Sequence, residues 1–429
     1  MVPETARLAH RGQAVRHSDP VRTSTSGITE LFAAYADRDP RVVASGNAAV
    51  PWRLLELLDA TVARYRLLML NAPKGIPDRA GVVHETSFVG PGMRHSPALS
   101  YVPARLSQVP LLFGAAQPPD IVLVHTSMPH EGKVSLGSEV NILPAAIEAC
   151  RARGGLVVAQ VNRQMPYTYG DGELALDTFD ATLETDEPVG RGHVVTSPDD
   201  AARSIGALVS ARIEDGATLQ LGIGEVPDAV LPGLVRKRGL GVWSEMVSDG
   251  LLALDRAGAL DEARPVVASF VIGSPELYAW LDHNPRVRIL RTETTNDPAR
   301  ICANPAMTSI NTALQIDLFG QANASRIKAR IHSGFGGQTD FVVGALHSRG
   351  GQALMALRSW HRKADVSTIV PLVEEPVTSF QHTAVITEQG VAPIFGYDER
   401  TQARHLIEGA AHPDVRDELR EEAVALRLM

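Results

Sequence analysis

The sequence predicts an α/β protein built from two open, mostly parallel-sheet domains of similar topology. Short β-branched runs alternate with Ala- and Leu-rich amphipathic stretches along all 429 residues, an order typical of parallel sheets flanked by helices. Several of these runs are continuously apolar, as expected for strands that are buried on both faces. The chain is also long enough for two domains that each bury a full core.

The expected strands are spread along the whole chain. They lie at 41–45, 121–126, 156–161, 218–221, 266–271, 287–290, 310–318, 367–372 and 384–387. A helix is expected after Ser197–Asp200, because Ser197 would serve as the N-cap, a proline follows it, and acids occupy the first turn. Apolar residues then recur at helical spacing and predict one buried stripe, formed by Ile205, Leu208, Val209 and Ile213.

A stretch rich in Gly, Pro and polar residues at Glu187–Pro198 predicts the domain boundary. We therefore expect a flexible N-terminal segment at 1–27, an N-terminal domain at 28–192 and a C-terminal domain at 193–429. A weak repeat links the two domains, because Ser45–Pro51 and Leu221–Pro227 both carry a glycine five residues before a proline. Chance explains this repeat equally well, since strand–Gly–Pro–helix segments are common in α/β proteins.

Composition argues against several classes of protein. The net charge is −8 and no basic run suggests a nucleic-acid partner. No apolar run approaches the ~20 residues of a membrane span, and the first residues lack the apolar core of a signal peptide. Two cysteines fit a reducing compartment, so we expect a cytoplasmic protein. The 14 histidines do not cluster at metal-ligand spacing, and no metal is expected.

Two glycine-rich segments are candidate ligand-binding loops. Gly222-Ile-Gly224 follows an expected strand, but Pro227 stands where a dinucleotide fingerprint needs a third glycine. A tight turn aimed at a helix N-terminus explains this segment as well. In Gly334–Phe341, backbone N–H groups would approach an oxyanion or a phosphate closely, although a plain turn is the alternative.

Several blocks of sequence resemble the acetyl-CoA hydrolase/transferase family, which includes the 4-hydroxybutyrate and acetate CoA-transferases. The blocks run in order over roughly residues 40–400 and include 222–230, 244–250, 273–278, 309–325, 334–341 and 387–392. The resemblance implies acyl-CoA thioester chemistry, with coenzyme A or acyl-CoA as substrate and no permanently bound cofactor. It also implies a small carboxylate as one candidate acceptor, and a homodimer or a dimer of dimers.

Gln315 is the departure from the family pattern with the greatest consequence. The pattern read onto Ser309–Ser325 places a nucleophilic glutamate where Gln315 stands. A neutral amide cannot form the anhydride and thioester intermediates of that mechanism. We therefore expect hydrolysis or an atypical acyl transfer, in which Gln315 orients the nucleophile and Glu388 or Glu245 acts as general base. Two alternatives stay open: an ordinary acyl-CoA:carboxylate CoA-transferase with an engineered glutamine, and a non-catalytic protein that binds CoA thioesters.

The site implied by the resemblance lies in the cleft between the two domains. Its CoA- and substrate-binding residues are expected to be Gly222, Gly224, Asn311, Gly334, Gly336, Gly337, Asp340 and Phe341. Two of the acids near these segments have plain structural explanations as well. Glu245 is equally well explained as part of a helix cap, and Asp317 as a structural residue on the same strand face as Gln315.

Overall fold

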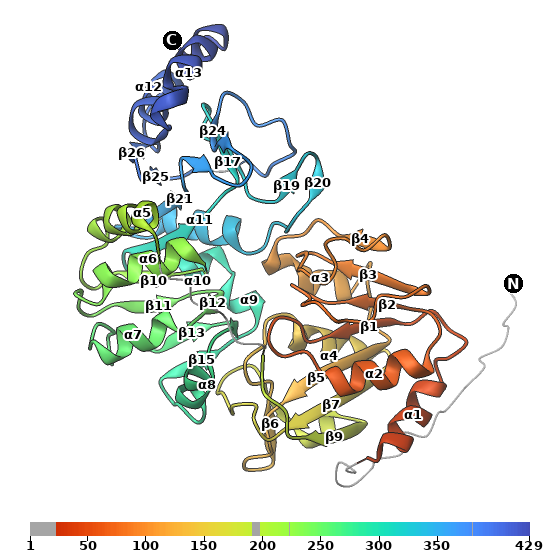
Figure 1. The fold of residues 1–429 in the computed structure, drawn as a ribbon. Helices are drawn as coiled ribbons and strands as arrows, with labels where there is room; N and C mark the ends of the chain where they lie inside the picture. The colour runs from red at the N-terminus through yellow and green to blue at the C-terminus, as the bar shows by residue number, and fades with distance from the viewer. Residues whose placement is uncertain (1–22, 191–197, 223, 380) are drawn as a thin grey trace, which may run out of the picture.

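The computed structural model describes residues 23–190, 198–222, 224–379 and 381–429. Within these ranges the chain forms two α/β halves, each built around one large sheet (Figure 1). Most of the predicted boundary at 187–198 and of the predicted N-terminal segment at 1–27 lies outside the described residues. The first helix already begins at Thr25, with the Ser24 side chain accepting a hydrogen bond from the Gly27 N–H.

The N-terminal half carries a seven-stranded sheet in the order β4-β3-β2-β1-β5-β7-β9. All neighbouring strands in it are parallel. β5 and β7 are buried along their whole length, which explains their continuous apolar runs. The strands are β1 (Arg41–Ala44), β2 (Tyr65–Leu68), β3 (Val82–Thr86), β4 (Leu99–Tyr101), β5 (Ile121–Thr126), β7 (Leu156–Asn162) and β9 (Ala181–Thr185).

Short helices and one antiparallel strand pair complete this half. The α-helices are α1 (Thr25–Ala33), α2 (Trp52–Thr61), α3 (Val109–Phe113) and α4 (Leu143–Ala152). The 3-10 helices are η1 (Leu106–Gln108) and η2 (Leu176–Thr178), and β6 (Lys133–Ser135) pairs antiparallel with β8 (Glu173–Ala175).

The C-terminal half carries an eight-stranded sheet in the order β15-β13-β11-β10-β16-β21-β25-β26. Neighbouring strands are parallel except for the β25–β26 pair at the edge. Its strands are β10 (Thr218–Gln220), β11 (Gly241–Trp243), β13 (Val266–Ala268), β15 (Val287–Ile289), β16 (Met307–Asn311), β21 (Gln352–Ala356), β25 (Ala384–Thr387) and β26 (Gly390–Pro393).

The two sheets have the same strand order up to β26. In each, the chain begins in the middle, adds three strands on one side and then crosses to the other side. β1 and β10 are therefore equivalent, and so are β2 and β11. This confirms the predicted fold of two parallel-sheet halves of similar topology. The repeat at Ser45–Pro51 and Leu221–Pro227 follows β1 and β10, the equivalent first strands.

The C-terminal half contains the helix expected after Ser197–Asp200, with a shifted start, and several further helices. They are α5 (Asp200–Ala211), α6 (Glu225–Leu234), α7 (Gly250–Arg256), α8 (Pro275–Leu281), α9 (Thr292–Thr295), α10 (Pro298–Cys302), α11 (Gln338–His347), α12 (Glu399–His405) and α13 (Arg416–Ala425), with short turns η3 (Leu406–Ala410) and η4 (Pro413–Val415). The N-cap of α5 is Asp199, not the predicted Ser197, because the Asp199 carboxylate accepts the Ala202 N–H at 3.0 Å.

The predicted strand at 310–318 is wrong as one element. β16 ends at Asn311, and the chain leaves the main sheet before β17 (Gln315–Asp317), which pairs with β18 (Ala322–Asn323) and β24 (Ile369–Val370). The reason is packing: Ile316 belongs to a separate apolar cluster that includes Ile369 and Ile394. In Figure 1 β17 and β24 lie in the part of the C-terminal half that also carries α12.

Three further two-stranded pairs belong to the C-terminal half. They are β12 (Met246–Val247) with β14 (Phe270–Val271), β19 (Arg326–Ile327) with β20 (Arg330–Ile331), and β22 (Trp360–His361) with β23 (Val366–Ser367), while β17 and β24 form the small sheet above. Within the described ranges, no helix is both long and apolar enough to span a membrane.

Candidate active site

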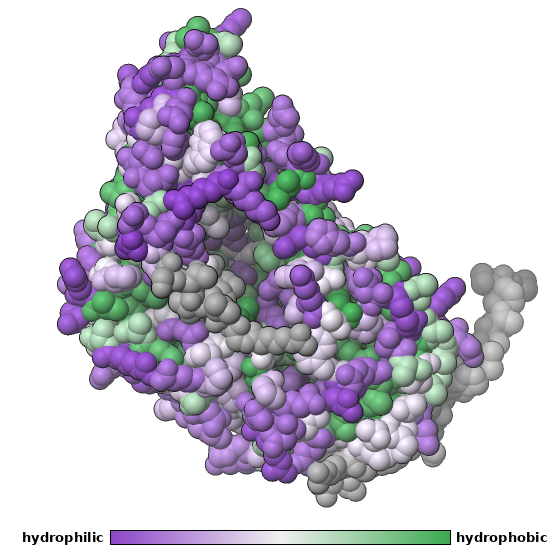
Figure 2. Space-filling view, in the orientation of Figure 1, coloured by the Kyte–Doolittle hydropathy of each residue, from purple (hydrophilic) through white to green (hydrophobic). Residues whose placement is uncertain are grey.

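A cavity of about 360 Å³ lies between the two halves. In Figure 2 the surface is hollowed in this region, while polar side chains cover much of the surrounding face. Its walls include residues that follow β1, β2, β10, β11 and β16, so it lies at the carboxyl ends of both sheets. In open α/β sheets, ligands bind at this edge, beside the strand where the chain switches sides. The strand order that the two sheets share therefore puts the cavity at the carboxyl ends of both sheets.

Glu245 follows β11 and lines the cavity, where it is partly exposed. Among the described lining residues it is the one ionisable side chain, since the other polar groups are amides and hydroxyls. Its Oε2 accepts a hydrogen bond from Asn296 Nδ2 at 3.1 Å, and the Gly337 N–H also bonds to the carboxylate. Burial raises the pKa of Glu245 to about 7, and the charge of Asp340 adds to the shift. The result is a poorly hydrated carboxylate that titrates near neutral pH.

The loop from Gly334 to Gly337 forms the wall beside Glu245. Its backbone is held by the N-terminal half, because Val89 N donates to Ser333 O at 2.8 Å and Leu106 N donates to Gly336 O at 2.9 Å. A Cβ atom at Gly337 would lie 1.7 Å from the Glu245 carboxylate. Only glycine lets the backbone N–H reach this carboxylate, which explains the glycine-rich sequence of the loop.

The structure brings most of the predicted binding residues to the cavity. Six of the eight line it: Gly222, Asn311, Gly334, Gly336, Gly337 and Phe341. Gly224 is outside the lining and caps α6, with φ of +122°. Asp340 is also outside the lining; it is buried in the first turn of α11, where it accepts hydrogen bonds from Ser107.

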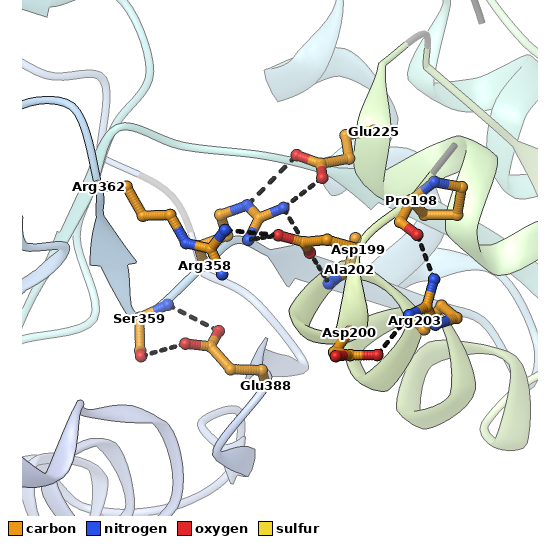
Figure 3. A network of polar contacts seen from close by, with 10 residues as sticks. All are labelled: Pro198, Asp199, Asp200, Ala202, Arg203, Glu225, Arg358, Ser359, Arg362 and Glu388. Carbon is orange, nitrogen blue, oxygen red and sulfur yellow. Dashed lines mark hydrogen bonds and ion pairs between the residues drawn. The ribbon is translucent and has the colours of Figure 1, made fainter. Parts of the chain in front are cut away.

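The structure does not bring the three predicted catalytic residues together. Gln315 lies on β17, paired with Asn323, and is not among the residues that line the cavity. Glu388 follows β25 and lines a separate pocket of about 300 Å³. In Figure 3 its carboxylate accepts hydrogen bonds from the N–H and the hydroxyl of Ser359. Burial opposes ionisation of Glu388, but these bonds outweigh it and lower its pKa. Glu245 alone of the three lines the cavity.

The network around Glu388 has its own centre at Arg358 (Figure 3). The Arg358 guanidinium bridges Asp199 and Glu225, at the N-terminal ends of α5 and α6. Arg362 adds a second ion pair to Asp199 at 2.8 Å. These contacts fix the start of α6, which follows the cavity residue Gly222.

The sequence interpretation missed a set of asparagines. Asn296 bonds to Glu245, while Asn47, Asn71 and Asn141 line the cavity from the N-terminal half. The last three have φ of 45°, 45° and 21°, a left-handed conformation that asparagine tolerates better than most residues. Asn71 Nδ2 donates to Asn47 Oδ1 at 2.8 Å. The available signal was weak: Asn47 and Asn71 each stand just after an apolar run.

A buried acid supports these asparagines from behind. Glu139 Oε1 accepts hydrogen bonds from Asn141 Nδ2 and from Gly46 N, both at 3.0 Å. Burial raises the pKa of Glu139 to about 7, so it carries a proton for much of the time at neutral pH. The N-terminal wall of the cavity therefore carries three asparagines beside the apolar Leu70, Phe88 and Leu106, and its lining side chains are uncharged.

Comparisons with known protein families match both halves of the chain. The acetyl-CoA hydrolase/transferase N-terminal domain matches residues 2–190, and the C-terminal domain of the same name matches residues 273–423. The 4-hydroxybutyrate coenzyme A transferase of Clostridium kluyveri is 37% identical over 357 residues, covering 79% of this chain and 81% of that protein. The succinyl-CoA:acetate/propanoyl-CoA:succinate CoA transferase of Fasciola hepatica is 36% identical over 407 residues, covering 88% and 83%.

Solved structures show the same fold along nearly the whole chain. RipA from Yersinia pestis superposes with a TM-score of 0.85 at 27% identity, covering 95% of this chain and 100% of that one. The 4-hydroxybutyrate CoA-transferase from Porphyromonas gingivalis superposes with a TM-score of 0.78 at 32% identity, covering 93% and 97%.

Proposed function

Because the chain belongs to the acetyl-CoA hydrolase/transferase family, we propose that it transfers coenzyme A between carboxylic acids, with Glu245 as the reacting carboxylate. One observation carries this proposal: Glu245 lines the cavity between the halves, with the Asn296 amide and the Gly337 N–H on its carboxylate. The preference for hydrolysis rested on the lack of a carboxylate at residue 315. With Glu245 in the cavity, that reason no longer favours hydrolysis over transfer.

The reaction proceeds through two exchanges at Glu245. The ionised carboxylate attacks the thioester carbonyl, the C–S bond breaks, and a mixed anhydride and a CoA thiolate result. The thiolate then attacks the Glu245 carbonyl carbon, which releases the first acid and leaves a glutamyl-CoA thioester. A second carboxylate reverses both exchanges and departs as the new acyl-CoA. Asn296 and Gly337 donate to the Glu245 oxygens, so they would stabilise negative charge as it develops there.

The asparagine wall supports a short, uncharged acyl group with a hydroxyl as the substrate. Asn71 uses one amide hydrogen on Asn47, and its Oδ1 and second hydrogen offer an acceptor and a donor that a hydroxyl can satisfy. None of the described residues that line the cavity is Lys, Arg or His, so a second carboxylate on the acyl group would be buried without a cation. The names of the Clostridium and Porphyromonas relatives, both 4-hydroxybutyrate transferases, agree with this substrate class.

Trapping the covalent intermediate tests the proposal. The protein is incubated with 4-hydroxybutyryl-CoA without an acceptor acid and treated with borohydride, which reduces a glutamyl thioester to an alcohol. Peptide mass mapping is expected to place the modification on Glu245. Modification of Asp317 instead would move the nucleophile to the small sheet. Release of free thiol without any modified peptide would favour direct hydrolysis and contradict the proposed transfer.

A further inference from the structure

A second buried carboxylate lies behind the wall that carries Gly337. Asp340 is 1% exposed and belongs to the C-terminal half. Its Oδ1 accepts the Ser107 hydroxyl at 3.0 Å and its Oδ2 accepts the Ser107 N–H at 3.3 Å. Ser107 lies on η1 of the N-terminal half, so these two bonds cross from one half to the other. Asp340 therefore bonds to other protein groups and does not line the cavity.

Asn296 joins this carboxylate to Glu245. Its side chain is fully buried and donates from Nδ2 to Glu245 Oε2 at 3.1 Å, and it also bonds to Asp340. Asn296 Oδ1 accepts the Thr295 hydroxyl at 2.8 Å, which fixes the direction of the amide. An NH₂ group has two hydrogens, so this one amide can donate to both carboxylates.

We propose that Asp340 is a positioning residue, which holds the Asn296 amide on Glu245 and links Glu245 to the N-terminal half through Ser107. This inference rests on the proposed role of Glu245. It assigns the arrangement of two carboxylates and one amide a function in the reaction, since the donor must stay in place while Glu245 changes from carboxylate to anhydride and thioester. It also explains why Asp340, predicted as a ligand contact, is buried away from the cavity.

The charge of Asp340 gives this role a measurable signature. Burial is the main cause that raises the pKa of Glu245, and the charge of Asp340 raises it further. Burial also raises the pKa of Asp340 to about 6, against the hydrogen bonds from Ser107 and the nearby charge of Arg105. Arg105 of the N-terminal half adds a positive charge close to Asp340. Loss of the Asp340 charge alone lowers the pKa of Glu245, because the ionised form loses a neighbouring negative charge. Loss of the Asn296 hydrogen bond raises that pKa, and this bond acts on Glu245 more strongly than the Asp340 charge does.

The pH dependence of kcat/KM in the Asp340→Asn variant tests the proposal. The wild type is expected to lose activity as pH falls below about 7, because Glu245 becomes protonated. In Asp340→Asn the midpoint is expected at higher pH, because the lost Asn296 hydrogen bond outweighs the lost charge, and kcat at pH 8 is expected to fall at least tenfold because the Asn296 amide is no longer held. A residue that acts only through its charge would move the midpoint to lower pH, and a merely structural residue would leave it in place, so a lower or unchanged midpoint overturns the proposal.

Two further variants keep the result interpretable. Ser107→Ala leaves the Asp340 carboxylate in place but removes one of its donors, and kcat at pH 8 is expected to fall about threefold. Asp282→Asn is the matched control: Asp282 Oδ1 accepts Tyr167 N at 2.7 Å, also between the halves, but Asp282 is outside the cavity lining. Its pH midpoint is expected to equal that of the wild type. Borohydride labelling of wild-type Glu245 is measured in parallel; absence of that label defeats the proposed function, whereas a label with unchanged Asp340→Asn kinetics defeats only this inference.

Discussion

In both halves the second strand in chain order ends at the cavity, yet the residue that follows it differs. β2 is followed by Asn71, an amide that bonds to Asn47. β11 occupies the equivalent place in the other sheet and is followed by Glu245, a carboxylate held by Asn296 and Gly337. The strand order thus fixes where a side chain enters the cavity, and the side chain decides whether it binds or reacts. In the proposed reaction, the N-terminal half supplies recognition groups and the C-terminal half supplies the nucleophile.

The largest effect is expected when the residue after β11 becomes an amide, like the residue after β2. Glu245→Gln places an amide after β11, as after β2, and removes the group that forms both covalent intermediates. Transfer of CoA between 4-hydroxybutyryl-CoA and acetate is expected to fall at least about 10³-fold, roughly 4 kcal/mol of transition-state stabilisation. Acyl-CoA binding, measured by calorimetry, is expected to persist.

Gln315→Glu is the control for this variant. It adds a carboxylate on β17, outside the cavity lining. In a Glu245→Gln background it is not expected to restore transfer, and restoration would return the nucleophile to residue 315.

A smaller effect is expected from a substitution of Gly337, whose loop lies between Glu245 and the N-terminal half. Gly337→Val places a side chain where a Cβ atom alone would lie 1.7 Å from the Glu245 carboxylate. Affinity for coenzyme A is expected to fall at least about tenfold, or 1.4 kcal/mol, because the loop must withdraw from the cavity. Gly114→Val is the matched control, since a Cβ atom there meets only Leu111 O, at 3.9 Å. Equal affinities in the two variants would argue against this loop as part of the binding site.

The smallest effect is expected at Asn71, which lines the cavity from the N-terminal half. Asn71→Leu keeps the size of the side chain but removes its donor and acceptor. The ratio of kcat/KM for 4-hydroxybutyryl-CoA over butyryl-CoA is expected to fall about fivefold, roughly 1 kcal/mol, which is the net value of one ordinary hydrogen bond. An unchanged ratio, or faster turnover of succinyl-CoA than of either substrate in the wild type, would show that the asparagine wall does not select hydroxyacyl groups.

The sequence predicted the class of fold because parallel strands buried on both faces leave a direct mark in apolar runs, as in β5 and β7. It did not predict the break between β16 and β17, because residues 310–318 are uniformly compatible with strand and only tertiary packing of Ile316 moves them to another sheet. The misplaced N-cap of α5 has a similar cause. Ser197 and Asp199 both suit a helix start, and the ion pair of Asp199 with Arg358 depends on residues more than 150 positions away.

The candidate site was predicted in part. The glycine loop was found from its composition, and Glu245 was named, although as a base and with a helix cap as an equal explanation. The contact of Glu245 with Asn296 and Gly337 joins three separate segments, and no local pattern reveals it. The left-handed asparagines were missed for a related reason: a positive φ depends on the turn that each strand makes into the cavity, and asparagine is only one residue that adopts it.

The attachment of the glycine loop to the N-terminal half bears on how this protein can diverge. The bonds from Val89 N to Ser333 O and from Leu106 N to Gly336 O join backbone to backbone. Side chains at these positions can change without removing the bonds, provided that the main chain keeps its path. In a chimera that joins one half of this protein to the complementary half of a distant relative, these backbone bonds can therefore still hold the glycine loop beside Glu245. A fragment that carries Glu245 alone loses the partner that holds this wall in place.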